Sequence, residues 1–308
     1  TAQIEIDPDG EVRLFTGVAD IGQGSDTVLL QIASESLGFP LKEIRLIRAD
    51  TAITTDSGAT SASRQTYISG NAILQAIKNL KQEAIKEASQ ILGIDEKDLF
   101  FEDGEIKSKT CLTISLPIQQ VAKRCGRVLR GEGSFDPETT RLDPKTGQGV
   151  PYATYAFATH LAEVEVDTET GKVKVNRVVV SHDVGKAIHP KNVVGQILGG
   201  VGMGIGFALM EEYIPGVKTS FVNYLIPTSK DIPEVIPMIV EEQEPTGPFG
   251  AKGVGEPALV PSAPAILNAI ADAIGQRIYS LPANLERVLE AVQRGMDINS
   301  KHQAPITK

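Results

Sequence analysis

Glycine constrains this chain more than any other residue type, because 29 of its 308 residues are glycine and many of them lie beside predicted core elements. Three segments combine glycine with a few polar side chains: residues 20–25 (DIGQGS), 58–63 (GATSAS) and 250–257 (GAKGVGEP). Gly195-Gln196 is a fourth candidate. Glycine lets backbone amides approach a ligand closely, and bare amides, hydroxyls and a Gln amide suit an anionic or polyheteroatomic cofactor. Tight turns and helix caps are the alternative for any one segment, but four segments in one chain favour a large bound ligand.

The hydrophobic pattern mixes strands and helices without regular βαβ alternation, so we predict an α+β fold. In the first half, the pattern predicts strands at 2–6, 11–16, 44–49 and 99–107, and helices at 26–37, 69–92 and 116–125. In the second half it predicts an antiparallel pair of strands at 153–167 and 172–182, and helices at 262–274 and 282–294. The region from 210 to 248 carries Pro215, Pro227, Pro233 and Pro237 and is predicted to be loop-rich.

Residues 136–151 are rich in Pro, Gly and Thr, which is typical of a connection between compact parts. We therefore predict two subdomains, residues 1–135 and 136–308. Thr1 begins directly in a predicted strand, with no initiator Met and no signal-peptide pattern. We expect the chain to be a piece, or the ordered part, of something longer.

Residues 192–210 carry no charge over about the length of a bilayer-spanning helix. Six glycines and Gln196 make this run a poor membrane segment, so we predict a buried helix and no membrane span. The Gly195/Gly199 and Gly200/Gly204 spacings place small residues on helix faces where another backbone can approach.

The charge and cysteine content exclude several classes of protein. A net charge of −9 argues against non-specific nucleic-acid binding, which needs clustered Lys and Arg. Two cysteines cannot hold an iron–sulfur cluster, and so few fit a reducing, cytoplasmic setting; we expect both to be buried thiols. The chain has no GxxxxGK[ST] loop, no strand-led GxGxxG fingerprint and no GxSxG elbow.

Glu256 is the candidate catalytic carboxylate. It lies in a glycine-proline segment ahead of an apolar helix, where we expect burial to raise its pKa towards that of a general base. A helix-start acid favoured by the helix dipole is the equal alternative. The spacing of His182-Asp183 and His189 matches no common zinc pattern, so a structural role is preferred for them, and His160 is expected to be a satisfied sheet residue.

Taken in order, these segments resemble the molybdenum hydroxylases of the xanthine dehydrogenase/aldehyde oxidase family. The matching stretches are Asp20–Gly24, Thr60–Ser63 leading to Tyr67–Asn71, His182–Gly185 through Gly195-Gln196, and Gly250–Pro257. The resemblance runs from about residue 10 to 294 and corresponds to the second half of the family's molybdopterin-binding subunit. It implies either a fragment or a subunit divided between two polypeptides, as in the medium molybdopterin subunit of the split nicotinate dehydrogenases.

The resemblance implies a site built around a molybdopterin dinucleotide, in the cytosine form usual in bacteria, whose molybdenum is held by the pterin dithiolene and not by protein side chains. Gln23 is similar to the amide that hydrogen-bonds an oxo ligand of the metal, and Gln196 to the glutamine that binds the pterin. Glu256 is similar to the general base beside the metal. The residues implied to line the cofactor are Ile21, Gly22, Gln23, Gly24, Thr60, Ser61, Ala62, Ser63, Gln196, Lys252, Gly253, Val254 and Gly255.

The resemblance also implies an enzyme that hydroxylates an electron-poor carbon of a nicotinate-like or purine N-heteroaromatic, with water as the source of oxygen. The implied partners are a companion chain carrying the first half of the subunit, an iron–sulfur subunit with 2Fe–2S clusters and a subunit with FAD, in a hetero-oligomer. The alternatives are an aldehyde-oxidising member of the family and a non-catalytic structural subunit. A small-molecule binding protein is disfavoured because half of the expected pocket is missing.

Overall fold

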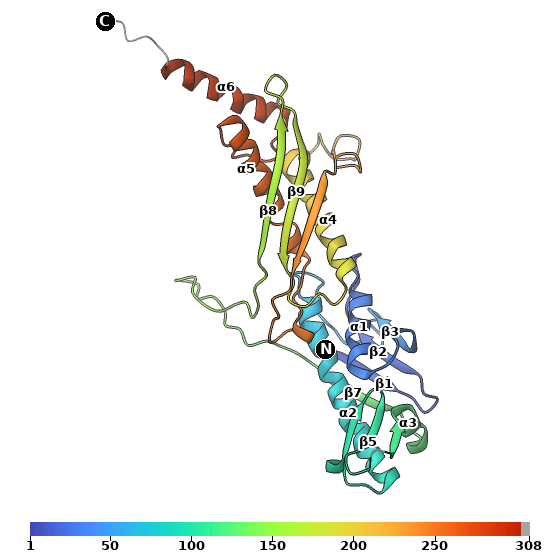
Figure 1. Ribbon diagram of the computed structural model, residues 1–308. Coiled ribbons are helices and arrows are strands. Elements are labelled where there is room, and N and C mark those ends of the chain that lie inside the picture. Colours follow the sequence, from blue (N-terminus) through green and yellow to red (C-terminus); the bar gives the residue numbers. More distant parts are fainter. Residues whose placement is uncertain (112, 303–308) are drawn as a thin grey trace, which may run out of the picture. The chain divides into compact units, whose positions relative to one another are not determined.

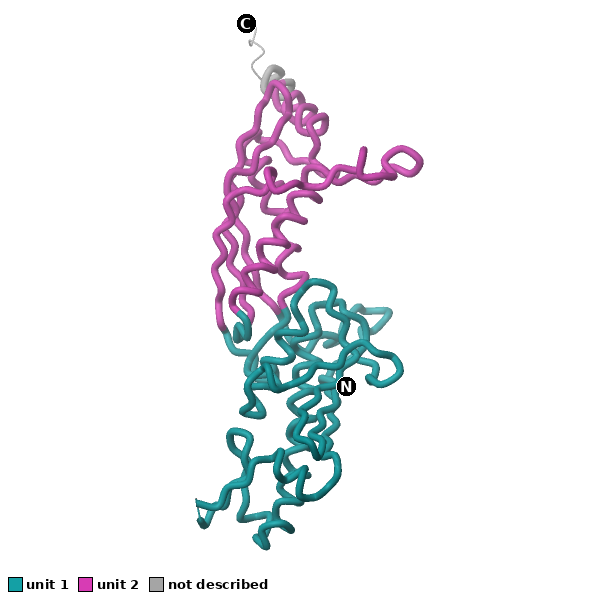
Figure 2. Tube along the Cα trace, turned by 90° about the vertical axis from the view of Figure 1, so that its right-hand side faces the viewer, with its two compact units in different colours: residues 1–155, 185–189, 242–253 teal, residues 156–184, 190–241, 254–308 magenta. Residues whose placement is uncertain are grey.

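The computed structural model describes residues 1–111 and 113–302, with side chains through residue 296. It confirms the α+β prediction, with three sheets and packed helices (Figure 1). The chain forms two compact units, coloured separately in Figure 2. Unit 1 comprises residues 1–155, 185–189 and 242–253, and unit 2 comprises residues 156–184, 190–241 and 254–308.

Unit 1 is built on a four-stranded sheet in the order β3-β2-β1-β7. Its strands are β1 (Ala2–Ile6), β2 (Val12–Thr16), β3 (Ile44–Arg48) and β7 (Leu129–Gly133). Helices α1 (Ser25–Leu37) and α2 (Gly70–Leu92) bury their apolar stripes against it. The hairpin and both helices were predicted from their hydrophobic periods, whereas β7 was not, because LRGEG has little β propensity.

Glycine allows β7 to lie directly on α2. A Cβ on Gly131 would come within 2.0 Å of the Ala76 carbonyl oxygen, and one on Gly133 within 2.2 Å of the Ala72 carbonyl oxygen. The backbone of α2 therefore occupies the space that side chains of β7 would otherwise fill.

A second sheet of unit 1 contains β4 (Leu99–Glu102), β5 (Glu105–Ser108) and β6 (Ser115–Pro117), followed by α3 (Ile118–Cys125). These elements join the same hydrophobic core. The prediction of two buried thiols is wrong: Cys111 is exposed and Cys125 is half-buried. Cys111 lies in a short turn where it contacts the hydroxyl of Thr113, away from the core.

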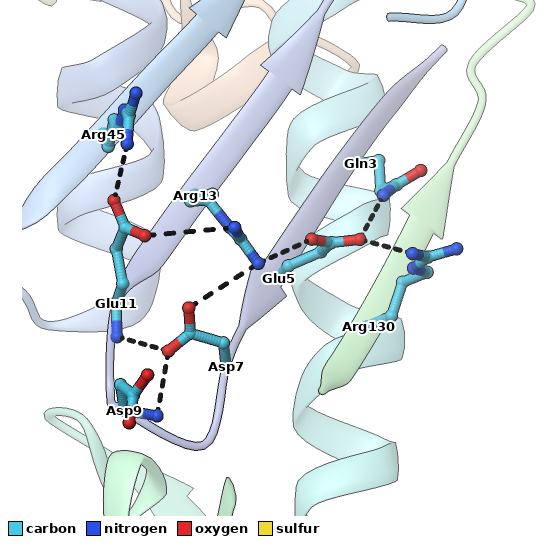
Figure 3. Close-up of polar contacts among 8 residues, drawn as sticks. All are labelled: Gln3, Glu5, Asp7, Asp9, Glu11, Arg13, Arg45 and Arg130. Carbon is cyan, nitrogen blue, oxygen red and sulfur yellow. Dashed lines mark hydrogen bonds and ion pairs between the residues drawn. The ribbon is translucent and has the colours of Figure 1, made fainter. Parts of the chain in front are cut away.

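A charged network covers the face of the four-stranded sheet that points away from α2 (Figure 3). Glu5 is buried there and accepts from Arg13 at 3.3 Å, Arg130 at 2.6 Å and Gln3 at 2.6 Å. Two guanidinium groups and an amide compensate the desolvation of this carboxylate, so the network serves the fold of unit 1.

Unit 2 contains a three-stranded sheet in the order β10-β9-β8. β8 (Ala158–Val166) pairs antiparallel with β9 (Val173–Asp183), as predicted, and β9 pairs parallel with β10 (Glu234–Val240). β10 is a strand that was not predicted within the loop-rich region 210–248. Pro237 is tolerated because β10 is an edge strand, where a missing N–H need not break a ladder.

The helices of unit 2 are α4 (Pro190–Leu209), α5 (Ser262–Ile274) and α6 (Leu285–His302). The stretches 190–209 and 256–274 are long and apolar enough to cross a membrane by length and composition alone. α4 is nevertheless packed along one side, through Val193, Ile197, Val201 and Ile205. The prediction of a buried helix is confirmed for this side and wrong for the other side, which exposes Leu198, Met203 and Phe207.

The compact units differ from the predicted subdomains 1–135 and 136–308. Residues 136–155 belong to unit 1, and so do the two short segments 185–189 and 242–253. These segments join unit 1 because they pair with each other, Lys186 N–H donating to the Gly250 carbonyl at 2.8 Å, and because Pro248 packs on Gly70 at the start of α2.

Candidate functional site

The first predicted loop, residues 20–25, lies between β2 and α1 in unit 1 and includes the first residue of α1. Gly22 and Gly24 both have left-handed backbone angles, φ 105° and φ 82°, which favour glycine. Asp20 fastens the loop by accepting from the N–H groups of Gly22 at 2.8 Å and Asp26 at 3.1 Å. Burial opposes ionisation of Asp20, but these backbone hydrogen bonds outweigh it and hold its pKa below the ordinary value. The Asp20 carboxylate therefore stays charged at the start of the loop.

Gln23 uses its side-chain amide within its own loop. Its Oε1 accepts from the Ile21 N–H at 2.7 Å, and its Nε2 donates to Ser25 Oγ at 2.9 Å. Nε2 also donates to the Ala19 carbonyl at 3.5 Å, so the predicted role of Gln23 as a donor to a ligand requires Nε2 to give up one of these two hydrogen bonds.

The second predicted loop, residues 58–63, is also fully within unit 1. Ser61 and Ala62 are exposed, and Ala62 and Ser63 adopt left-handed φ angles of 53° and 49° although neither is glycine. Such angles cost free energy and cluster at functional sites. The loop contains no acidic side chain.

The structure brings these two loops together. Thr60 Oγ1 donates to the Ala19 carbonyl at 2.7 Å, and the buried Gln65 side chain donates to Thr60 Oγ1 at 3.1 Å. Gln65 opens a π-helical turn, Gln65–Ser69, and Ser69 Oγ donates back to its Oε1 at 2.7 Å. π-Helical turns are frequent at functional sites. A continuous chain of hydrogen bonds therefore runs from the start of α2 to the Gln23 loop.

A third predicted segment, residues 250–253, contacts the second loop. A Cβ on Gly253 would lie 1.6 Å from the Ser63 carbonyl oxygen, so only glycine fits there. Lys252 is buried, and it lies close enough to Glu244 to affect its ionisation. Burial opposes ionisation of Glu244, but hydrogen bonds from Thr246 and Thr154 and the charge of Lys252 hold its pKa below the ordinary value.

The other predicted site residues, Val254, Gly255, Glu256 and Gln196, belong to unit 2. The expectation that Glu256 is buried is wrong within this chain, since its side chain is exposed. Its backbone is nevertheless well fixed: the Glu256 carbonyl accepts from Leu259 N–H at 2.9 Å and Val260 N–H at 3.1 Å. Gln196 is half-buried in the first half of α4.

α4 supports the Glu256 turn through two of its glycines. A Cβ on Gly200 would lie 2.4 Å from the Ala258 carbonyl oxygen, and one on Gly204 would lie 2.2 Å from Ser262 Cβ. The prediction that small residues let another backbone approach is confirmed at Gly200. Gly195 and Gly199 face open space, with nothing within 4 Å of an added Cβ.

Ser262, the first residue of α5, is tied to the sheet by two histidines. Ser262 Oγ lies 3.1 Å from His160 Nδ1, and His160 Nε2 lies 2.9 Å from His182 Nε2. The expectation that His160 is a satisfied sheet residue is confirmed. Because the two Nε2 atoms share one proton, the two rings cannot both carry a positive charge. Burial, and secondarily the neighbouring His182, lower the pKa of His160 to about 4.

This histidine pair makes stability depend on pH. In the unfolded chain the His160 imidazole binds a proton near pH 6.5, whereas in the folded chain this imidazole stays neutral down to about pH 4. Unfolding therefore takes up a proton in this window, and the free energy of unfolding should fall as the pH drops, by on the order of 2 kcal/mol from His160. Urea unfolding of the chain at pH 7.0, 5.5 and 4.5 measures the effect.

His160→Gln is the matched control, because an amide keeps a hydrogen-bonding side chain and cannot titrate. We expect the variant to be less stable at pH 7 and to lose less stability than the wild type between pH 7.0 and 4.5. Equal losses in the two proteins would contradict the assignment to His160.

Three residues that fasten the loops were not among the predicted site residues: Asp20, Arg64 and Gln65. Asp20 opens the first predicted loop, and Arg64 and Gln65 directly follow the second, where Arg64 Nη1 donates to the Ser57 carbonyl at 2.7 Å. Polar residues at the edges of glycine loops are the signal that could have indicated them.

The loops of unit 1 fit a molybdopterin-type cofactor in the chemistry of their donors: left-handed backbone, exposed small side chains and no carboxylate at 58–63. The sequence profile described as "Molybdopterin cofactor-binding domain" matches residues 1–233. The chain belongs to this family, in the group that contains xanthine dehydrogenases and aldehyde oxidoreductases.

Three comparisons illustrate the relationship. The putative xanthine dehydrogenase molybdenum-binding subunit XdhA of Escherichia coli (strain K12) is 32% identical over 301 residues, covering 94% of this chain and 39% of that protein. The crystal structure of aldehyde oxidoreductase from Desulfovibrio desulfuricans ATCC 27774 superimposes with a TM-score of 0.80 at 36% identity, covering 94% of this chain and 30% of that one. The crystal structure of quinoline 2-oxidoreductase from Pseudomonas putida 86 superimposes with a TM-score of 0.81 at 29% identity, covering 95% of this chain and 38% of that one. The chain therefore spans less than two fifths of these relatives.

Proposed function

We propose that this chain is the molybdopterin-binding second half of a molybdenum hydroxylase that acts on an electron-poor carbon of an N-heteroaromatic, nicotinate-like or purine, with water as the source of oxygen. The observation that carries the proposal is the Thr60–Ala19 hydrogen bond, which joins the two predicted cofactor loops into one structure within unit 1. Two of the three relatives described above are named for xanthine and quinoline, which are N-heteroaromatics.

The cofactor, when bound, supplies the two-electron redox centre and activates the oxygen. The chain supplies the cradle. Backbone amides at Gly22, Gly24 and residues 60–63 receive the anionic and heteroatom-rich parts of the pterin dinucleotide, and Gln23 and Gln196 contribute amides. Lys252, Gly253, Val254 and Gly255 carry the backbone from this cradle towards Glu256.

Glu256 acts as the general base. Glu256 is exposed among the described residues, which supports a role for the bound cofactor and a companion polypeptide in excluding water from it. A carboxylate fixed by its backbone and covered on assembly is suited to accept a proton from the attacking water.

The proposed assembly is a cytoplasmic hetero-oligomer. It comprises a companion chain with the first half of the subunit, an iron–sulfur subunit with 2Fe–2S clusters and an FAD subunit, because the two cysteines of this chain cannot carry electrons onward. The subunit is proposed to be divided as in the nicotinate dehydrogenase type, and the cofactor is proposed to be the cytosine dinucleotide.

Metal and nucleotide analysis of the purified complex tests the proposal. We expect molybdenum in a ratio of about one per chain and an equal amount of CMP after acid treatment. A fully assembled complex that lacks both would contradict it and support a non-catalytic structural subunit. GMP in place of CMP would contradict the cytosine form only.

An aldehyde substrate is the second candidate, favoured by the similarity to the aldehyde oxidoreductase structure. Turnover of the complex with nicotinate and xanthine, compared with benzaldehyde, separates the two. Oxidation of benzaldehyde alone would assign the chain to the aldehyde-oxidising members.

A further inference from the structure

The sheet of unit 2 has two faces with very different surroundings. Helices α4 and α5 pack on the face that carries His160, Val178 and Val180, and both valines are fully buried there. The opposite face carries Leu161, Val179, Ile236, Met238 and Val240, which we call the apolar face. Leu161, Met238 and Val240 are 60%, 47% and 46% exposed.

The register of the strands makes the apolar face continuous. Leu161 lies beside Val179, and Val179 lies beside Ile236, so that one apolar row crosses all three strands. Met238 and Val240 extend the face along β10, because alternate residues of a strand point the same way.

A row of charged side chains borders the apolar face on one side. Arg177 lies between Glu163 and Glu234, with nitrogen–oxygen distances of 3.7 Å and 3.3 Å, on the three strands next to the apolar row. An apolar centre bordered by exposed ion pairs is the usual composition of a protein–protein interface.

Parts of β9 and β10 have the sequence expected of strands covered on both faces, whereas β8 alternates. Residues 178–180 of β9 and 235–240 of β10 are continuous apolar runs, whereas a strand with one solvated face alternates apolar and polar residues. The described residues of this chain cover one face only.

The length of the relatives indicates what covers the other face. The chain corresponds to 39% of the E. coli XdhA subunit, so more than half of that polypeptide has no counterpart here. A second copy of this chain is a poorer occupant, because each copy carries a net charge of −9 and like charges oppose close approach.

We propose that the apolar face of unit 2 is the docking surface for the polypeptide that supplies the remainder of the molybdenum-binding subunit. This inference rests on the proposed function, because it assumes that such a companion is part of the enzyme. The companion presents a complementary apolar surface, and docking buries Leu161, Ile236 and Met238 at its centre.

Co-expression tests the docking surface. The full 308-residue chain is produced together with the part of E. coli XdhA that it does not match, as a separate tagged polypeptide, and binding is measured by affinity purification and titration. We expect the wild-type chain to bind, and Leu161→Asp and Met238→Asp each to weaken binding by about tenfold or more, because a charge is then desolvated at the centre of the interface.

Glu165→Lys is the matched control, an equally drastic charge change on the same strand as Leu161 but beyond the charged row. It should change binding by about twofold at most, as expected for a rim charge. Circular dichroism and thermal unfolding of each variant confirm that the fold is kept, which the exposure of the mutated side chains favours.

Three outcomes overturn the inference: no binding by the wild-type chain, unchanged binding by both aspartate variants, or a homodimer in sedimentation that Met238→Asp dissociates. Failure of the proposed chemistry is distinguishable, because it leaves the two polypeptides assembled but without molybdenum. Failure of the docking surface leaves binding insensitive to the two aspartates whether or not the metal is present.

Discussion

Glu256→Gln should abolish turnover of the assembled enzyme and leave its molybdenum content near that of the wild type. The amide has the size of the carboxylate but cannot accept a proton, so the rate should fall by roughly 10²–10⁴, the usual contribution of a general base. The cofactor contacts proposed above are made by other residues, and the backbone of the turn is fixed by hydrogen bonds that the substitution leaves in place. Steady-state kinetics with metal analysis of the same sample measures both quantities.

Glu169→Gln is the control for this experiment, because Glu169 is an exposed carboxylate of unit 2 in the turn between β8 and β9. It should leave turnover unchanged. Full activity in Glu256→Gln would eliminate Glu256 as the base. A parallel loss of molybdenum would instead assign Glu256 to holding the cofactor.

The exposure of Glu256 shows that the sequence could predict the backbone of this turn but not the burial of its carboxylate. A glycine-proline segment ahead of an apolar helix predicts a fixed backbone, and the turn does fix it, but burial of the carboxylate requires atoms that lie opposite it. Among the residues that the structure describes, Glu256 remains exposed. The same reasoning applies to the apolar face of unit 2, where continuous apolar runs indicate two-sided burial and the chain covers one side.

Local periodicity was sufficient to predict most of the regular elements. α1 and α2 were readable from apolar residues at helical spacing, and β1 and β2 from strict alternation around a glycine turn. β7 and β10 were missed because their sequences break the local rules: β7 replaces side chains by the backbone of α2, and β10 contains a proline that only its edge position permits.

Long-range contacts in the candidate site could not be predicted from spacing. The bond between Thr60 and Ala19 joins residues 41 positions apart, and the contact of Gly253 with Ser63 joins residues 190 positions apart. The sequence could indicate that each glycine segment approaches something closely. Whether the neighbour is a ligand or another part of the chain is a property of the fold: Gly253 and Gly200 touch backbone, whereas Gly22 has nothing within 4 Å of an added Cβ.

Two adjacent glycines of α4 allow this distinction to be measured. Gly200→Ala places a methyl group 2.4 Å from the Ala258 carbonyl oxygen and 2.5 Å from its carbon, and neither backbone atom can move without displacing the turn that carries Glu256. We expect the free energy of unfolding to fall by about 2 kcal/mol or more, even after the helix-favouring effect of alanine. Urea unfolding with an unchanged m-value measures it.

Gly199→Ala is the matched substitution one position earlier, on the open side of the same helix, and it should have the opposite sign. Nothing lies within 4 Å of the new methyl group, so only the backbone entropy of glycine is removed and stability should rise by about 0.5–1 kcal/mol. In the assembled enzyme, Gly200→Ala should also slow turnover, because the clash displaces Ala258 and with it the backbone of Glu256. Equal stability changes in the two variants would contradict the packing of α4 on this turn, and a stable but inactive Gly200→Ala enzyme would separate the placement of Glu256 from the stability of the fold.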